Sequence, residues 1–115
     1  HGFLPAKIVA FLLNSHITPR PIYLCCPGET HASREGRFGG ETVLTANGRL
    51  FAVRLADFVF EEFENQPLPL LWTSQQMGTR QTVEHIPAVS FCWRHLNSLD
   101  TGAWEGKTEL EVATE

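Results

Sequence analysis

The sequence is short of positive charge, of cysteine and of long apolar runs. Lysine and arginine together number nine against thirteen aspartate and glutamate residues, which gives a formal net charge of −4. Nucleic acids and membrane surfaces both recruit basic faces, so this balance argues against either partner. The longest apolar run, residues 8–13, is far too short to span a bilayer. We also expect no secretory signal, because the N-terminus lacks a basic flank followed by an apolar core and a small-residue cleavage site.

The three cysteines, Cys25, Cys26 and Cys92, do not form a disulfide pattern. Their number is odd, two are adjacent and no Cys-x-x-Cys occurs. This usage favours a reducing compartment, so the cytoplasm is the expected location. His31 and His85 have no histidine or cysteine at zinc-like spacing. The sequence therefore predicts no metal site, and no motif indicates a cofactor.

The N-terminal third predicts a helix, a strand and a loop. Residues 2–16 are expected to be helical, with Pro5 in the first turn and apolar residues at helical spacing. Prolines after residue 18 end this helix. The apolar run at residues 22–26 fits a buried strand, and residues 27–43 are expected to form a loop with several glycines.

The remainder alternates between helical and strand patterns. A helix is expected over residues 49–64, with Thr45 as its cap and a core-facing stripe made of Ala52, Leu55, Ala56, Val59 and Phe63. Residues 70–73 and 89–93 predict short strands, with a weakly helical stretch at 78–84 between them. This order predicts an α/β fold with mostly parallel strands. The acidic residues 108–115 have no predicted structure.

The loop after residue 26 could handle phosphate or carry a reactive thiol. Its glycines fit neither of the common nucleotide-binding patterns, Gly-x-x-x-x-Gly-Lys-Ser/Thr and Gly-x-Gly-x-x-Gly. A cysteine phosphatase would need an arginine six residues after its thiolate, and six residues after Cys26 stands Ala32. Pro27 offers no N–H to stabilise a thiolate. A buried structural cysteine pair is the favoured interpretation.

Four segments carry a family resemblance, in order and at compatible spacing. They are KIVAFLLNSHITPRPIYLC at 7–25, GRFGGETVLTANG at 36–48, WTSQQMGTRQTVE at 72–84 and LNSLDTGAWEG at 96–106. The chain resembles the bisphosphatase domain of 6-phosphofructo-2-kinase/fructose-2,6-bisphosphatases, within the histidine phosphatases. The resemblance implies a partial phosphoglycerate mutase-like fold, with a short, mainly parallel sheet flanked by helices. It also implies that residues 1–21 are the end of a kinase-type domain with its connector helix, and that residues 22–115 are the first half of a bisphosphatase-like domain.

The resemblance also implies a set of catalytic residues that this sequence lacks. In the family, a histidine accepts the phosphoryl group, two arginines and a second histidine hold its oxygens, and a glutamate protonates the leaving oxygen. Cys26 stands at the first arginine, Pro27 at the nucleophile, Gly78 at the second arginine and Ser98 at the acid. Ser33 replaces a family asparagine, and the second histidine belongs to a later strand that the sequence does not reach. We therefore predict no phosphohistidine chemistry.

Three residues remain as candidates for contact with phosphate: Arg37, Gly39 and Arg80. Arg37 matches a family arginine and either touches a residual anion or is simply solvated. Arg80 would take the place of the family's second arginine only if the motif is shifted by one or two residues in this sequence. The predicted ligand is fructose 2,6-bisphosphate or phosphate.

Two readings of function follow, with a weaker third. The first is a degenerate, non-catalytic domain that is regulatory or structural in fructose 2,6-bisphosphate metabolism. The alternative is an active phosphatase on that ester or another phosphoester, completed by a missing segment; the third is an interaction module. In the resembled fold, the strand that carries the second histidine separates the first two strands. Without it, residues 22–26 and 70–73 either pair directly or leave a gap, so we expect self-association or a partner strand.

Overall fold

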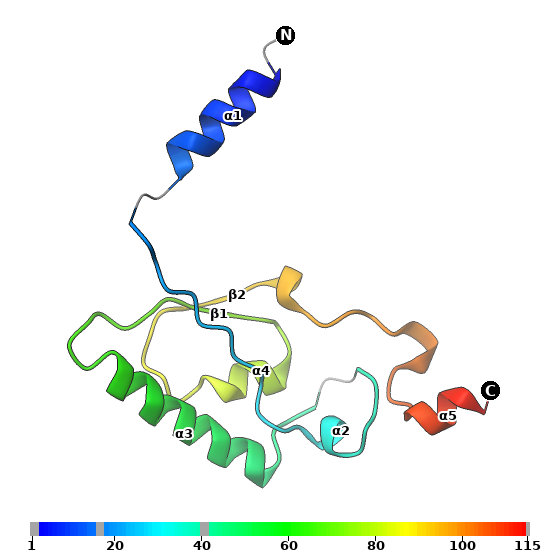
Figure 1. The fold of residues 1–115 in the computed structure, drawn as a ribbon. Helices are drawn as coiled ribbons and strands as arrows, with labels where there is room; N and C mark the ends of the chain where they lie inside the picture. The colour runs from blue at the N-terminus through cyan, green and yellow to red at the C-terminus, as the bar shows by residue number, and fades with distance from the viewer. Residues whose placement is uncertain (1–2, 16–17, 40–41, 115) are drawn as a thin grey trace.

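The computed structural model describes residues 3–15, 18–39 and 42–114. Its main elements are α1 (Phe3–Asn14), α3 (Ala46–Glu62), β1 (Leu71–Thr73), α4 (Met77–Thr82) and β2 (Ser90–Cys92). Short turns of helix complete it: α2 (His31–Arg34), η1 (Arg94–Leu96), η2 (Gly102–Trp104) and α5 (Glu109–Ala113). Figure 1 shows α1 standing apart from the other elements, to which an extended stretch joins it. Among the described helices, none is long and apolar enough to cross a membrane.

The described sheet has two parallel strands. Leu71, Trp72 and Thr73 face Ser90, Phe91 and Cys92 in register. Further backbone bonds extend the ladder at both ends, from Leu71 N to Val89 O at 2.9 Å and from Trp93 N to Thr73 O at 2.8 Å. The connection between the strands runs through α4, as a parallel pair requires. The predicted parallel α/β arrangement is therefore confirmed.

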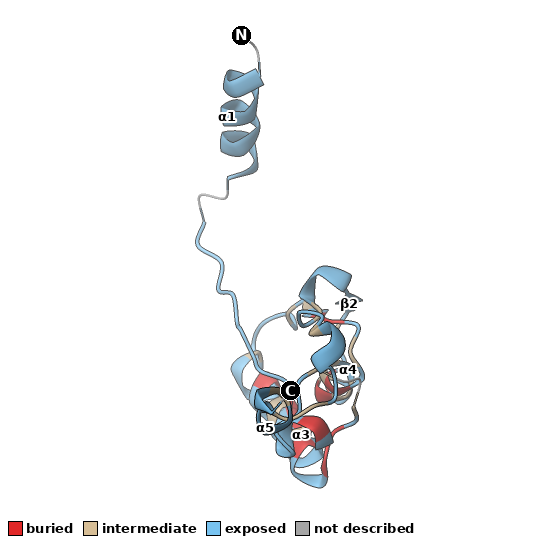
Figure 2. Cartoon of the chain, turned by 90° about the vertical axis from the view of Figure 1, so that its right-hand side faces the viewer, coloured by how far each residue is buried: buried red, intermediate tan, exposed pale blue. Residues whose placement is uncertain are grey.

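Helix α3 supplies the core. Thr45 caps it by accepting a hydrogen bond from Gly48 N at 3.1 Å, as predicted, although the helix begins at Ala46 rather than at residue 49. Ala56 and Val59 are buried with Ile86, and Leu55 and Phe63 of the predicted stripe pack against them. Figure 2 shows the buried residues gathered around α3 and α4, while α1 is exposed along its length.

Two glycines let the first loop lie directly on the start of α3. A Cβ on Gly28 would lie 2.8 Å from the carbonyl oxygen of Gly48, and one on Gly48 would overlap the carbonyl oxygen of Glu29. Hydrogen bonds hold this contact, from Thr45 N to Glu29 O and from Gly28 N to Thr82 Oγ1, both at 2.9 Å. The loop is thus fixed against both α3 and α4.

The predicted strand at residues 22–26 does not form. This stretch is extended but pairs with no described strand, and Ile22 and Leu24 are 85% and 94% exposed. A strand needs a neighbour for its backbone groups, and β1 pairs only with β2 in the described sheet. The sequence predicted that residues 22–26 either pair directly with residues 70–73 or leave a gap beside them. The structure shows the gap. The segment is anchored instead through Tyr23, whose hydroxyl donates to Glu62 at 3.0 Å and whose ring meets Phe63 edge-on.

The cysteine interpretation is wrong as well. Cys25, Cys26 and Cys92 are all free and exposed. The first two are exposed because the predicted strand at residues 22–26, which would have buried them, does not form. The thiols therefore contribute nothing to a core.

The acidic C-terminal stretch is ordered as α5. Thr108 caps it by a capping box with Glu111, in which each side chain accepts from the other residue's backbone N–H. An isolated antiparallel bridge between Arg37 and Thr108 ties this stretch to the first loop, with Phe38 N donating to Lys107 O at 2.8 Å. The first loop and the stretch that begins α5 therefore lie side by side.

Candidate functional site

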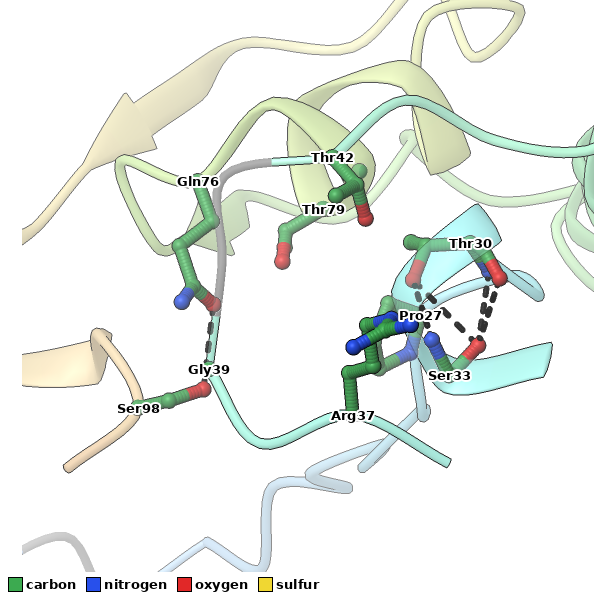
Figure 3. A pocket seen from close by; sticks show the side chains of 10 residues that line it. Pro27, Thr30, Ser33, Arg37, Gly39, Thr42, Gln76, Thr79 and Ser98 are labelled. Atoms are coloured by element: carbon green, nitrogen blue, oxygen red, sulfur yellow. Dashed lines mark hydrogen bonds between the residues drawn. The ribbon is translucent and has the colours of Figure 1, made fainter. Parts of the chain in front are cut away.

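A pocket of about 190 Å³ lies where this first loop, α4 and the segment after β2 converge. Figure 3 shows Thr30, Ser33, Pro27 and Arg37 on one side of it and Gln76 and Ser98 on the other. Its described lining consists of Pro27, Thr30, Ser33, Arg37, Gly39, Thr42, Gln76, Gly78, Thr79 and Ser98. The residues come from three stretches that are far apart in the sequence.

The pocket gathers most of the positions that the sequence singled out. Pro27, Gly78 and Ser98, the expected places of nucleophile, second arginine and acid, all line it. Two of the phosphate-binding candidates, Arg37 and Gly39, line it too. Cys26 and Arg80 are not among the lining residues. Most of the positions singled out in the sequence therefore lie at one site, and Cys26 and Arg80 lie outside its described lining.

Local hydrogen bonds position the near wall. Thr30 caps α2 through a capping box with Ser33: Ser33 N donates to Thr30 Oγ1 at 3.1 Å, and Thr30 N donates to Ser33 Oγ at 2.9 Å. His31 N donates to Val43 O at 3.3 Å, beside an antiparallel bridge between Thr30 and Leu44. Leu44 N in turn donates to Gln81 Oε1 of α4 at 2.9 Å. These bonds fix the loop to the helix that forms the opposite wall.

The far wall is built from side-chain hydrogen bonds. Ser98 Oγ donates to Gln76 Oε1 at 3.1 Å, and Gln75 N donates to Asn97 Oδ1 at 2.8 Å. Ser74 and Thr79 share a hydroxyl contact of 2.9 Å. Sequence reasoning overlooked Thr42, Gln76 and Thr79 because it searched for charged and nucleophilic groups. The cluster of threonine and serine after β1 was the available signal.

Arg37 is the only charged side chain among the described lining residues, and its charge is already paired. Its Nε donates to Glu35 at 2.8 Å, and its Nη1 donates to Gly106 O at 2.8 Å and to Glu111 at 3.3 Å. The hydrogen bond from Arg37 and its charge hold the pKa of Glu35 below the usual value. The pKa of Glu111 is lowered mainly by the backbone N–H of Thr108, with the charge of Arg37 adding to the effect. The guanidinium thus serves as a link between loop and α5.

The described lining holds no imidazole, thiol, carboxyl or ammonium group. The nearest thiols do not supply one, since neither Cys25 nor Cys26 reaches the lining. Partial desolvation raises the pKa of the Cys25 thiol, and its neighbour Cys26 adds to that rise. Within the described residues, histidine, cysteine, aspartate and glutamate nowhere form a group suited to hold a metal. The described lining can donate and accept hydrogen bonds through its hydroxyls and the Gln76 amide, and Arg37 is its one charged group.

Residues 22–115 match the family model of the histidine phosphatase superfamily (branch 1), and the chain belongs to this superfamily. The chain is 40% identical over 114 residues to the 6-phosphofructo-2-kinase/fructose-2,6-bisphosphatase of Arabidopsis thaliana. This alignment covers 96% of this chain and 15% of that protein. It is 39% identical over 109 residues to the human protein 6-phosphofructo-2-kinase/fructose-2,6-bisphosphatase 4, covering 95% and 23% respectively. The chain spans less than a quarter of the length of either of these relatives.

Solved structures share the fold. A phosphoserine phosphatase from Entamoeba histolytica aligns with a TM-score of 0.66 at 22% identity, over 77% of this chain and 45% of that one. A mycobacterial glucosyl-3-phosphoglycerate phosphatase aligns with a TM-score of 0.66 at 24% identity, over 76% and 45%. The predicted partial phosphoglycerate mutase-like fold is thereby confirmed.

Proposed function

We propose that this chain is a degenerate, non-catalytic bisphosphatase-like domain of a 6-phosphofructo-2-kinase/fructose-2,6-bisphosphatase-type protein. Its role is regulatory or structural in fructose 2,6-bisphosphate metabolism, in the cytoplasm. The proposal is carried by one observation: Pro27, Gly78 and Ser98 line the same pocket, each at a position where the family has a reactive or charged group. The ligand of that pocket, if phosphorylated, would be fructose 2,6-bisphosphate or phosphate.

The chemistry argues against turnover. Phosphoryl transfer through a protein intermediate needs a nucleophile in line, positive charge around the oxygens and a proton donor for the leaving group. Proline has no nucleophilic side-chain group, and the pKa of a serine hydroxyl is far too high for an efficient general acid near neutral pH. Losing the nucleophile alone typically removes several orders of magnitude of rate, and losing its partners adds little more.

The packing around Gly78 supports the same view. A Cβ at this position would lie 2.7 Å from Thr30 Cγ2 and 3.3 Å from Thr42 O, closer than such contacts normally allow. An arginine there would require Thr30, whose hydroxyl caps α2, to shift or change rotamer. The present packing therefore suits a glycine better than an arginine.

We also propose that residues 1–21 are the end of a kinase-type domain with its connector, and that the uncovered 22–26 segment takes part in self-association or receives a partner strand. Helix α1 supports the first point, because it has no buried residue and an apolar sequence that another surface could cover. The second point is supported by the 22–26 segment, which pairs with no described strand and whose residues are exposed.

An active phosphatase remains the second candidate, supported by the phosphatase names of the relatives and fold neighbours. One experiment separates the two. The chain is incubated with fructose 2,6-bisphosphate labelled with ³²P at the 2-phosphate, and labelled protein and free phosphate are measured. We expect neither acid-labile label on the protein nor release above a no-protein control. Acid-labile label, or release that a Ser98→Ala change alters, would establish the enzyme instead.

A further inference from the structure

The polar groups of the pocket are mainly hydroxyls. Five of its described lining residues carry one, namely Thr30, Ser33, Thr42, Thr79 and Ser98. Gln76 adds an amide. A hydroxyl can both donate and accept, so such a wall matches a ligand whose own groups do the same. The volume of about 190 Å³ leaves room for several water molecules or one small organic molecule.

Some of this hydrogen-bonding capacity is unused within the described residues. Gln76 Oε1 accepts from Ser98, which leaves the two N–H groups of the Gln76 amide for a ligand. Thr79 Oγ1 contacts only Ser74 Oγ, at 2.9 Å. On the opposite wall, Arg37 uses Nε and Nη1 on protein acceptors, and its Nη2 group keeps two donors. Donors therefore approach from both sides.

Net charge distinguishes this pocket from a phosphate site. Arg37 is the only cation in the described lining, and it is shared by the carboxylates of Glu35 and Glu111. A phosphate dianion would have to give up its hydration and then sit beside those two carboxylates with a single compensated cation. A neutral molecule with several hydroxyls carries no charge to compensate, and its oxygens can accept from the N–H groups of Gln76 and Arg37.

We propose that the pocket binds a neutral, polyhydroxylated small molecule, a free sugar or polyol, in preference to a phosphate ester. The inference rests on the proposed function, because a pocket that performs phosphoryl transfer must hold the phosphate best. On this proposal, the domain binds an uncharged sugar at the position where its relatives carry their reactive groups.

The test is a titration of the ¹⁵N-labelled full chain with D-fructose and, separately, with inorganic phosphate at constant ionic strength. We expect fructose to shift the backbone amides of Gln76, Thr79 and Ser98 saturably, with a Kd at least tenfold below that of phosphate. Ser98→Ala should weaken fructose binding about fivefold, the effect of one neutral hydrogen bond. Ser90→Ala is the matched control, since Ser90 is also exposed but lies on β2, outside the described lining.

Glu111→Gln tests the charge argument. Glutamine can still close the capping box of α5, so the variant is expected to fold as the wild type does, which its amide spectrum checks. Removing one carboxylate from Arg37 should tighten phosphate binding at least threefold and leave fructose binding unchanged. Phosphate binding more tightly than fructose in the wild type, binding of neither ligand, or shifts that map away from the pocket would each overturn the inference. Phosphate release from fructose 2,6-bisphosphate would instead overturn the proposed function.

Discussion

At the scale of single residues, Thr45 and Thr101 show what a buried hydroxyl contributes with and without a partner. Thr45 is 3% exposed, and its Oγ1 both caps α3 and donates to Glu29. Thr101 Oγ1 is buried beneath Gly39 and has no hydrogen-bond partner among the described residues. A buried polar atom without a partner keeps its desolvation cost with nothing to offset it.

Replacing each hydroxyl with a methyl group should therefore have opposite effects. We expect Thr101→Val to raise the free energy of unfolding by roughly 1 kcal/mol, because it removes the unpaired group at nearly constant shape. Thr45→Val should lower it by about 1–2 kcal/mol through loss of the cap. Urea unfolding followed by circular dichroism measures both. A destabilised Thr101→Val variant would mean that the hydroxyl has a partner after all.

The carboxylates around Arg37 give a dependence on pH. The pKa values of Glu35 and Glu111 are lowered in the folded chain from the ordinary 4.5, so their contribution to stability is complete above that value. It is lost as the pH falls through 4.5 and on through the lower folded pKa values. Both groups are exposed, so the effect is small.

We expect the urea midpoint to fall between about pH 6 and about pH 3, and to fall less in Glu111→Gln. The comparison isolates Glu111, because glutamine keeps the length and the capping contact without titrating. Parallel curves for the two proteins would show that Glu111 keeps neither the hydrogen bond from Thr108 N nor the contact with Arg37 in solution.

At the scale of elements, the close approach of α3 to the first loop depends on Gly48. A methyl group there would overlap the carbonyl oxygen of Glu29 and separate the helix start from the loop that lines the pocket. We expect Gly48→Ala to lower stability by about 1–3 kcal/mol, despite alanine's higher helix propensity. Asn47→Ala, one residue earlier on an exposed position of the same helix, should gain a few tenths of a kcal/mol instead. Thermal unfolding of the pair is the measurement, and equal shifts would contradict the packing argument.

The elements that local pattern specifies were predictable, and those that depend on distant partners were not. Thr45 and Phe63 cap α3 at its two ends and the rest of the predicted stripe lies within it, so local spacing alone revealed them. Residues 22–26 have the composition of a strand, but a strand exists only beside another. Helix α5 was overlooked although Thr108 and Glu111 form a readable capping box. The site positions emerged from the family motif, whereas the pairing of Arg37 with Glu111 spans 74 residues and has no local signal.

At the scale of the whole molecule, the chain exposes far more surface than a folded monomer of its mass. Its accessible surface is 9460 Å², against about 6300 Å² expected for 12.9 kDa. Its radius of gyration is 18.9 Å, against about 13 Å for a compact domain of this length. The difference in area exceeds what one side of a standard protein interface covers, roughly 800 Å². The surface therefore fits the proposed association.

We expect light scattering during size exclusion to give a concentration-dependent mass of at least twice 12.9 kDa. Leu24→Asp should weaken association about tenfold or more, because Leu24 is 94% exposed on the unpaired 22–26 segment. Leu110→Asp is the control, with a 79% exposed leucine on α5, away from the gap, and should change nothing. A stable monomer that unfolds cooperatively would refute the association, and tight capture of an added strand by a monomer would favour a partner strand.

The indole rings of Trp72 and Trp93 meet edge-on at 6.1 Å across the two strands and are 67% and 46% exposed. Tryptophan emission moves to shorter wavelength when water leaves the ring, so this pair is an intrinsic optical probe of the bare sheet. Binding of any molecule to that face, whether another copy or a separate chain, should therefore shift the tryptophan emission to shorter wavelength. The shift would report binding before the mass or identity of the molecule is known.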